Sequence, residues 1–355
     1  MVIKSFIHKV REKKRINNER FYEMQLNIGS INPLYRQPLT AEEKTLYKKM
    51  WGGGVTGNIA TDELEVFKYF YGFNKNFVGH NIYLPIIARK LNNYHYTKLF
   101  EDKCLLSQFS KVLDVPKTIC CCINGDYFDG RMNVILADDV DKIVHSIDRE
   151  VIIKPTRESS GGKGVIKLTG KKFNRKNLGS DWIIQECVSQ YEILDLFNDS
   201  SLNTFRITSL YLNGKVSICN IILRFGNKGS VVDNFGSGGN LIGVYEDGRL
   251  YDFAFNHELK KLKSINNISF SEFRFEFIPS VLDLIRKAHI EDFSLCNYIG
   301  WDIAIDNNGN PILIEVNSSQ PGIFMEQLAT GVPAFGGREQ EVLDYIKNKE
   351  FSYKQ

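Results

Sequence analysis

The sequence predicts an α+β protein with a mainly helical N-terminal region. Before residue 100 the apolar residues follow helical spacing, at 41–50 and 60–71. Beyond residue 100, short apolar or alternating runs dominate, with helices expected at 102–111 and near 275–289. Such runs favour mostly antiparallel strands. The expected strands are 117–123, 132–136, 150–155, 164–169, 181–187, 204–212, 215–224, 241–245, 299–306 and 311–317.

The composition is that of an ordinary soluble globular protein, 43% hydrophobic and 25% charged over 355 residues. A formal net charge of +3 is small for this length and indicates no nucleic-acid partner. The seven cysteines lack the spacing of a metal site, and Cys120, Cys121 and Cys122 are adjacent, so a reducing, cytoplasmic setting is expected. No apolar stretch approaches the ~20 residues of a membrane-spanning helix, and the start lacks a signal peptide's apolar core.

Residues 1–26 place Val2, Phe6 and Val10 at helical spacing among lysines and arginines. We interpret this segment as an amphipathic helix that packs on its own domain, with peripheral contact to the inner face of the membrane as the alternative. The glycine-rich stretch at 52–57 has neither the GxGxxG nor the GK[ST] pattern of a phosphate site, so it is expected to be a turn.

Residues 299–317, IGWDIAIDNNGNPILIEVN, form two apolar runs around Asn308-Gly309, a strong hairpin signal. A two-residue loop at these positions sets the register, and Asn317 then shares the face of Glu315. The expected pairs are Ile305–Ile312, Ile303–Ile314 and Asp302–Glu315. The opposite face must be buried and consists of Trp301, Ile303, Ile305, Ile312, Ile314 and Val316.

In this register, Asp302 and Glu315 lie directly opposite each other, with Cβ atoms about 4.5–5.5 Å apart. Two carboxylates so close repel unless a cation or proton lies between them. Oxygen ligands from Asp, Glu and Asn suit Mg²⁺ together with a polyphosphate. A solvated polar face is the alternative, but such faces usually interleave Lys or Arg with the acids, and the hairpin has none there. The sequence therefore predicts a magnesium site at Asp302, Glu315 and Asn317.

Residues 150–169, EVIIKPTRESSGGKGVIKLT, contain a strand that ends at Lys154, a serine- and glycine-rich loop and a second strand. Because no helix follows, the loop suits a hairpin lid whose amides and Ser159 and Ser160 hydroxyls close over phosphates, with Lys154 adding charge. For the loop alone, a mobile turn is the alternative. Downstream, residues 182–188 form a strand that ends in Gln185-Glu186 and suits backbone hydrogen bonds to a planar base.

Together these motifs resemble the ATP-grasp superfamily, which includes D-alanine–D-alanine ligase and ribosomal-protein glutamate ligases. The resemblance covers about residues 100–335, and QECVSQYEILDLFNDSSLNTFRI is similar to the sugar-transfer-associated branch found with capsular or surface polysaccharide genes. It implies two α+β subdomains that grip ATP, at 101–190 with the lid and at 191–345 with the metal hairpin. The helical patterning before residue 100 adds a mainly helical region at 1–100.

The resemblance also implies roles for individual residues. Arg206 and Arg224 match the basic residues that face the transferred phosphate and the substrate; for either arginine alone, a surface salt bridge is the alternative. The implied nucleotide contacts are Lys103, Lys154, the lid residues Ser159, Ser160, Gly161, Gly162 and Gly164, and the adenine-hinge residues Gln185, Glu186 and Val188. Asp302, Glu315 and Asn317 match the magnesium ligands.

Two departures from the superfamily affect the arginines. Thr204 stands where glutamate ligases carry an acid, which leaves the ribose contacts open, and Gly300 stands where D-alanine ligases carry an arginine. The arginine role must then fall on Arg206 or Arg224. A two-residue Asn213-Gly214 turn would put these two on opposite faces of their hairpin, so we predict a three-residue loop with a glycine bulge.

The implied activity is that of an ATP- and Mg²⁺-dependent carboxylate–amine ligase. It would form an acylphosphate from a small-molecule carboxylate such as a sugar acid, and join it to an amine or amino acid in surface-polysaccharide biosynthesis. The alternatives are a phosphotransferase that acts on a hydroxyl and a nucleotide-binding module without turnover. Residues 231–244 are either a substrate loop or a disordered crossover. The sequence predicts neither the oligomeric state nor the identity of the two substrates.

Overall fold

The computed structural model describes residues 33–52, 60–157, 164–227, 229, 233, 235–347 and 349. The predicted helix at 1–26 and lid residues Ser159, Ser160, Gly161 and Gly162 lie outside the described residues. Within them, no helix is both long and apolar enough to cross a membrane.

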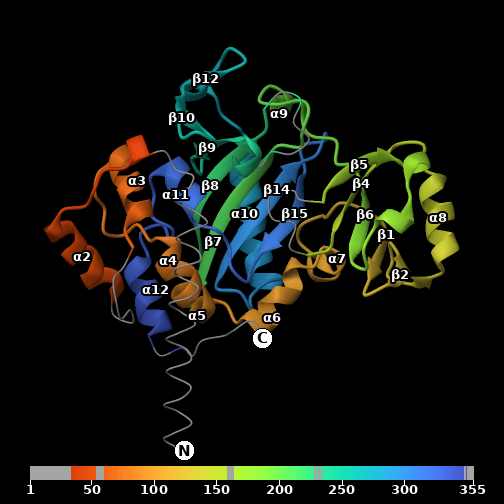
Figure 1. Cartoon of the computed structure of the whole chain (residues 1–355), viewed down its shortest axis with the longest axis horizontal. Coiled ribbons are helices and arrows are strands. Elements are labelled where there is room, and N and C mark those ends of the chain that lie inside the picture. Colours follow the sequence, from red (N-terminus) through yellow and green to blue (C-terminus); the bar gives the residue numbers. More distant parts are fainter. Residues whose placement is uncertain are drawn as a thin grey trace, which may run out of the picture.

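A seven-stranded antiparallel sheet forms the centre of the molecule, and a six-stranded antiparallel sheet lies beside it, next to the edge strand β15 (Figure 1). The strand order in the central sheet is β11-β10-β9-β8-β7-β14-β15. Its strands are β7 (Thr204–Leu212), β8 (Lys215–Phe225), β9 (Asn240–Val244), β10 (Leu250–Asn256), β11 (Lys261–Leu262), β14 (Tyr298–Ile305) and β15 (Pro311–Asn317).

The six-stranded sheet has the order β3-β2-β1-β6-β4-β5, and α8 (Ala137–His145) packs on it. A separate two-stranded hairpin pairs β12 (Ser264–Ile265) with β13 (Ile268–Ser269). The strands of the six-stranded sheet are β1 (Thr118–Ile123), β2 (Asp126–Asp129), β3 (Val134–Ile135), β4 (Glu150–Pro155), β5 (Ile166–Thr169) and β6 (Trp182–Glu186).

Helices cover both faces of the central sheet. On one face, α10 (Ile278–Glu291) packs with Val281, Leu282 and Ile285 against buried residues of β7, β8 and β14. The other face is covered by the N-terminal helices and two C-terminal helices. These are α2 (Ala41–Trp51), α3 (Asp62–Tyr71), α4 (His80–Ile82), a π-helix (Tyr83–Ala88), α5 (Arg89–Leu91), α11 (Phe324–Thr330) and α12 (Glu339–Ile346), and the short helix α6 (Tyr94–Thr97) follows α5 in the chain.

Every expected strand is present to within about two residues, and the antiparallel pairing and the α+β class are confirmed. The helix expected at 102–111 is wrong in extent, because only α7 (Leu106–Phe109) forms, between turns that place Lys103 and Ser110 in buried positions. The strands β2, β10, β11, β12 and β13, the helices α8, α11 and α12, and the short helices between residues 80 and 97 were not predicted as separate elements. These elements are short or weakly patterned, and tertiary packing stabilises them more than local preference does.

The N-terminal helices are joined to the hairpin of β14 and β15 by the buried side chain of Asn92. Its amide donates to the carbonyls of Tyr298 (2.6 Å) and Ser318 (2.5 Å), and its oxygen accepts from the backbone N–H groups of Asn297 (2.7 Å) and Tyr298 (3.1 Å). One side chain thus satisfies backbone groups at the start of β14 and just beyond the end of β15.

We expect Asn92→Ala to lower the free energy of unfolding by about 3 kcal/mol or more, because several buried backbone groups lose their partner at once. Asn93→Ala is the matched control. Asn93 is exposed and only caps α6, accepting from the backbone N–H of His95 at 3.1 Å, so its loss should cost about 1 kcal/mol. Denaturant unfolding measures both; equal losses would contradict the role of Asn92.

Candidate active site

The carboxylates of Asp302 and Glu315 lie opposite each other on β14 and β15, as predicted, but through a different loop. The N–H of Asp306 donates to the carbonyl of Asn310 at 2.9 Å, so the loop comprises three residues, and Gly309 has φ +84°. The side chain of Asp306 accepts from the N–H groups of Asn308 and Asn310, which stabilises this longer turn. The predicted two-residue loop is therefore wrong.

A bulge at Ile314 then restores the register. Ile303 pairs with Leu313 rather than Ile314, and Ile305 pairs with Pro311 rather than Ile312, whereas Asp302 still pairs with Glu315. As a result Leu313, not Ile312 or Ile314, is fully buried in the core, and Ile314 lines the same cleft as Glu315. Trp301, Ile303, Ile305 and Val316 are buried as predicted.

In the hairpin of β7 and β8, which carries Arg206 and Arg224, the turn is shorter than predicted rather than longer. Asn213 and Gly214 form a two-residue turn with φ values of +53° and +77°, so the predicted three-residue loop is wrong. The bulge lies instead within β8, at Cys219, because Ser209 pairs with Ile218 while Thr208 pairs with Asn220. This extra residue puts Arg206 and Arg224 on the same face, which was the expected consequence.

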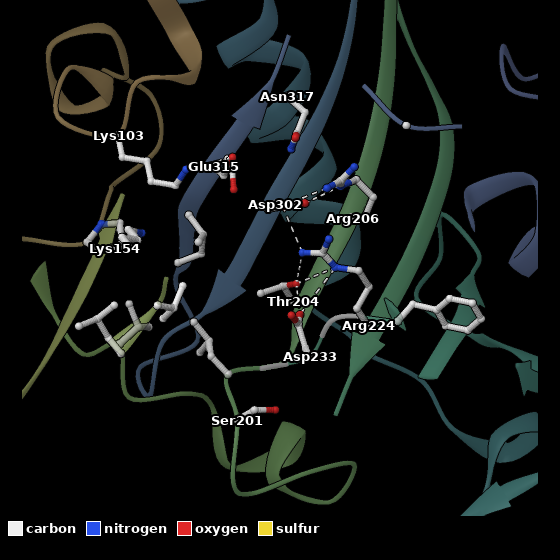
Figure 2. A pocket seen from close by; sticks show the side chains of 18 of the residues that line it. Lys103, Lys154, Ser201, Thr204, Arg206, Arg224, Asp233, Asp302, Glu315 and Asn317 are labelled. Carbon is white, nitrogen blue, oxygen red and sulfur yellow. Dashed lines mark hydrogen bonds and ion pairs between the residues drawn. The ribbon is translucent and has the colours of Figure 1, made fainter. Parts of the chain in front are cut away.

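Both arginines converge on Asp302 (Figure 2). The Arg206 guanidinium binds both carboxylate oxygens, with Nε–Oδ1 at 2.5 Å and Nη2–Oδ2 at 3.1 Å, and Arg224 Nη2 lies 3.1 Å from Oδ2. Burial raises the pKa of Asp302, but the two guanidinium groups outweigh that effect and hold it below its usual range. The cations that the hairpin sequence lacks therefore come from β7 and β8, which weakens the argument that charge repulsion alone requires a metal.

Two buried lysines face this hairpin from the six-stranded sheet and the segment before it. Lys103 Nζ lies 3.1 Å from Glu315 Oε1, and Lys154 projects from β4 into the same cleft. Burial and, to a smaller extent, the charge of Lys103 lower the pKa of Lys154 to about 8, and Glu315 opposes this shift. Two ammonium groups held this way form a site for a polyanion.

The cleft continues along β6, where Gln185, Glu186 and Val188 line it. The Gln185 amide donates to the carbonyl of Pro116 at 3.1 Å, while its oxygen is buried and has no partner among the described residues. Glu186 forms ion pairs with Lys117 (2.9 Å) and Arg149 (2.6 Å). The backbone N–H of Glu186 also donates, to the carbonyl of Lys117 at 3.0 Å, so both its side chain and its N–H are already paired. The orphaned oxygen of Gln185 suits a ligand with an amino donor, such as adenine.

The cleft encloses about 1210 Å³ and is lined by residues of both sheets and of the N-terminal helices. It brings together every described candidate residue except Gly164, which adopts φ +76° against Pro155 just before β5. The candidate residues from the sequence that line the cleft are Lys103, Lys154, Gln185, Glu186, Val188, Arg206, Arg224, Asp302, Glu315 and Asn317.

Sequence reasoning missed charged residues at the far end of the cleft. Thr204 and Arg224 both contact Asp233, and buried Glu326 on α11 lies 3.5 Å from Arg206 Nη1. His80, paired with Glu63, also lines this end. Asp233 belongs to the predicted substrate loop, of which Asp233 and 235–244 are described, but Glu326, His80 and Glu63 stand in ordinary helical sequence without a local signal.

The donor atoms of the hairpin fit Mg²⁺. Asp302, Glu315 and Asn317 line one cleft, and the Asn317 amide donates to the carbonyl of Gly300 at 3.3 Å, which leaves its oxygen as the end suited to a cation. Among the described residues there is no cluster of three or more His, Cys, Asp and Glu that could hold a metal. Two carboxylates and an amide, completed by phosphate oxygens and water, match the small protein share of ligands that Mg²⁺ commonly takes.

Two antiparallel sheets with a cleft between them, lysines on one side and an acidic hairpin on the other, define an ATP-grasp protein. Residues 87–342 match the family described as sugar-transfer-associated ATP-grasp, and the chain belongs to this family. No protein of curated function matches the sequence.

Several solved structures are similar to the chain at low sequence identity. D-alanyl-alanine synthetase A from Vibrio cholerae is 12% identical, with a TM-score of 0.40 over 70% of this chain and 65% of that chain. L-amino acid ligase from Bacillus licheniformis is 13% identical, with a TM-score of 0.37 over 88% and 61%. The biotin carboxylase domain of Hydrogenobacter thermophilus 2-oxoglutarate carboxylase is 14% identical, with a TM-score of 0.44 over 73% and 48%. The chain spans less than two thirds of the length of each.

Proposed function

We propose that the chain is an ATP-dependent carboxylate–amine ligase that activates a sugar acid or related carboxylate as an acylphosphate in surface-polysaccharide biosynthesis. The observation that carries the proposal is the convergence of two lysines, three oxygen ligands and two arginines on one cleft. Its volume of about 1210 Å³ exceeds the ~300–1,000 Å³ of ordinary small-molecule sites, which leaves room for further substrates beside a nucleotide. The description of the family supports a sugar-related substrate.

Asp302, Glu315 and Asn317 would hold the Mg²⁺, which when bound offsets the charge of the phosphate oxygens. Lys103 and Lys154 bind the phosphates, and Gln185 with the neighbouring backbone orients the base. Arg206 and Arg224 stabilise the charge of the transferred phosphoryl group. No nucleophilic side chain is needed, because the carboxylate of the substrate itself attacks the γ-phosphate.

A product screen tests the proposal. The full chain is incubated with MgATP, a panel of uronic acids and nucleotide sugar acids, and a panel of amino acids, and both ADP and free phosphate are measured. A ligase releases ADP and phosphate in equal amounts only when acid and amine are both present. A phosphotransferase would keep the phosphate on its product, and a chain that transfers no phosphate from ATP across the panel would contradict both activities.

The pKa of Lys154 near 8 predicts a pH-dependent affinity for ADP. Below pH 8 the ammonium is charged and binds phosphate directly, whereas above it a proton must be taken up on binding. The affinity should therefore fall by up to about tenfold for each pH unit above 8. Calorimetric titration of the wild type and Lys154→Arg measures this, because arginine stays charged. The same slope in both proteins would contradict the assignment.

A further inference from the structure

The carboxylate of Glu101 binds the two residues that directly follow the candidate metal ligand Asn317. Glu101 ends the short 3₁₀ helix η4 (Lys98–Glu101), its side chain is 15% exposed, and it lines the cleft. Its Oε1 accepts from the backbone N–H groups of Ser318 at 3.0 Å and Ser319 at 2.6 Å, and from the Ser319 hydroxyl at 2.7 Å. One carboxylate oxygen thus holds three donors of a single short stretch.

This stretch begins where the strand pairing of the hairpin ends. Asn317 is the last residue of β15 and pairs with Gly300 on β14. Ser318 and Ser319 are buried, and buried backbone N–H groups need an acceptor. Glu101 supplies that acceptor for both residues. It therefore fixes the direction in which the chain leaves Asn317.

The side chain of Asn317 has little else to hold it in place. Its amide donates to the carbonyl of Gly300 at 3.3 Å, which is longer than a usual hydrogen bond, and its oxygen is the end suited to a cation. The position of this oxygen therefore depends on the backbone that carries it. Groups that orient metal ligands without touching the metal commonly set its affinity.

We propose that Glu101 is a positioning residue of the magnesium site, which acts on Asn317 through the backbone of Ser318 and Ser319; this rests on the proposed function. The segment that carries Glu101 precedes Lys103 by two residues, so one short stretch of chain serves both the metal side and the phosphate side of the cleft.

Lys103 itself is anchored independently of Glu101. Its backbone N–H donates to the carbonyl of Thr156 at 3.0 Å, and its Nζ lies 3.1 Å from Glu315 Oε1. Loss of the Glu101 carboxylate should therefore leave the phosphate-binding lysine in place. The metal affinity and the nucleotide affinity should respond differently to the same substitution.

Binding of Mn²⁺ in the presence of ADP tests the proposal in the full chain. Mn²⁺ takes the same oxygen ligands as Mg²⁺, and electron paramagnetic resonance measures its free concentration. We expect Glu101→Ala to weaken Mn²⁺ binding by about 10–100-fold, as is typical for residues that orient metal ligands. The affinity for ADP without metal should stay close to that of the wild type.

Two conservative variants separate hydrogen bonding from charge, and they keep the test decisive if Glu101→Ala does not fold. Glu101→Gln keeps an oxygen that can accept from Ser318 and Ser319, and it loses the ion pair of Oε2 with Lys98 Nζ at 2.7 Å. Its Mn²⁺ affinity should be close to that of the wild type. Glu101→Asp keeps the charge but is one methylene too short for these hydrogen bonds, so it should bind Mn²⁺ more weakly. The reverse order would overturn the inference.

Asp292→Ala is the matched control. Asp292 Oδ2 accepts from the backbone N–H groups of Lys111 at 2.8 Å and Val112 at 2.9 Å, which is the same kind of contact at a residue that does not line the cleft. Its loss should lower stability and leave Mn²⁺ binding unchanged. Equal Mn²⁺ losses in Asp292→Ala and Glu101→Ala would overturn the positioning role. A wild-type chain whose Mn²⁺ affinity is not raised by ADP would count against the metal site itself, and with it the inference.

Discussion

Glu315→Ala should lower MgATP-dependent turnover by about 10³-fold or more while the fold remains intact. The substitution removes one of two carboxylates in the proposed metal site and breaks the 3.1 Å contact with Lys103 Nζ. Without this carboxylate the proposed metal is held less well. The negative charge that builds up on the phosphate oxygens during phosphoryl transfer is then offset less well. The side chain is 27% exposed and lies at the cleft, so its loss creates no core cavity. Phosphate release with the active acid and amine pair measures the effect.

The control for this prediction is Glu291→Gln, which removes a charge from the exposed C-terminal turn of α10, on the opposite side of the central sheet. Its turnover should equal that of the wild type. Binding of ADP without metal should weaken far less in Glu315→Ala than turnover does, because the lysines remain. Turnover that survives Glu315→Ala would refute the metal assignment.

The pairing of Asp302 with Glu315 was predictable from the sequence, but for a reason that the structure corrects. Two errors cancel: the loop is one residue longer than expected, and the bulge at Ile314 restores the register. At the arginine hairpin the expected bulge lies in β8, at Cys219, instead of at the turn. Alternating patterns predict which side chains share a face over a few residues, whereas bulges depend on packing between strands.

The charge environment of the site could not be predicted from local sequence. Asp302 is neutralised by arginines from β7 and β8, and Glu315 by Lys103, about 200 residues earlier in the chain. The His80 and Glu326 end of the cleft depends on helices α4 and α11 meeting over the central sheet. Contacts between distant segments leave no periodicity or motif within either segment, so only the folded chain reveals them.

Arg206→Lys should lower turnover by about 100-fold or more and change the affinity for ADP little. Arg206 binds both oxygens of Asp302 and also approaches Glu326, a geometry that the single ammonium of lysine cannot reproduce. An arginine that stabilises a transferred phosphoryl group contributes mainly to the transition state. Lysine keeps the positive charge between the two buried carboxylates. Arg206→Ala would instead leave Glu326 without this cation and Asp302 with Arg224 alone, at a cost of about 3–5 kcal/mol of stability.

The control is Arg286→Lys on α10, where the guanidinium is partly exposed and pairs with Glu246 and Asp283 at the surface. Surface pairs contribute about 0–1 kcal/mol, so neither stability nor turnover should change appreciably. Steady-state kinetics, ADP titration and denaturant unfolding of the same preparations separate the possible effects. A lower kcat with unchanged ADP affinity and stability places Arg206 in phosphoryl transfer. Wild-type kcat in Arg206→Lys would instead assign it only to the charge balance of Asp302 and Glu326.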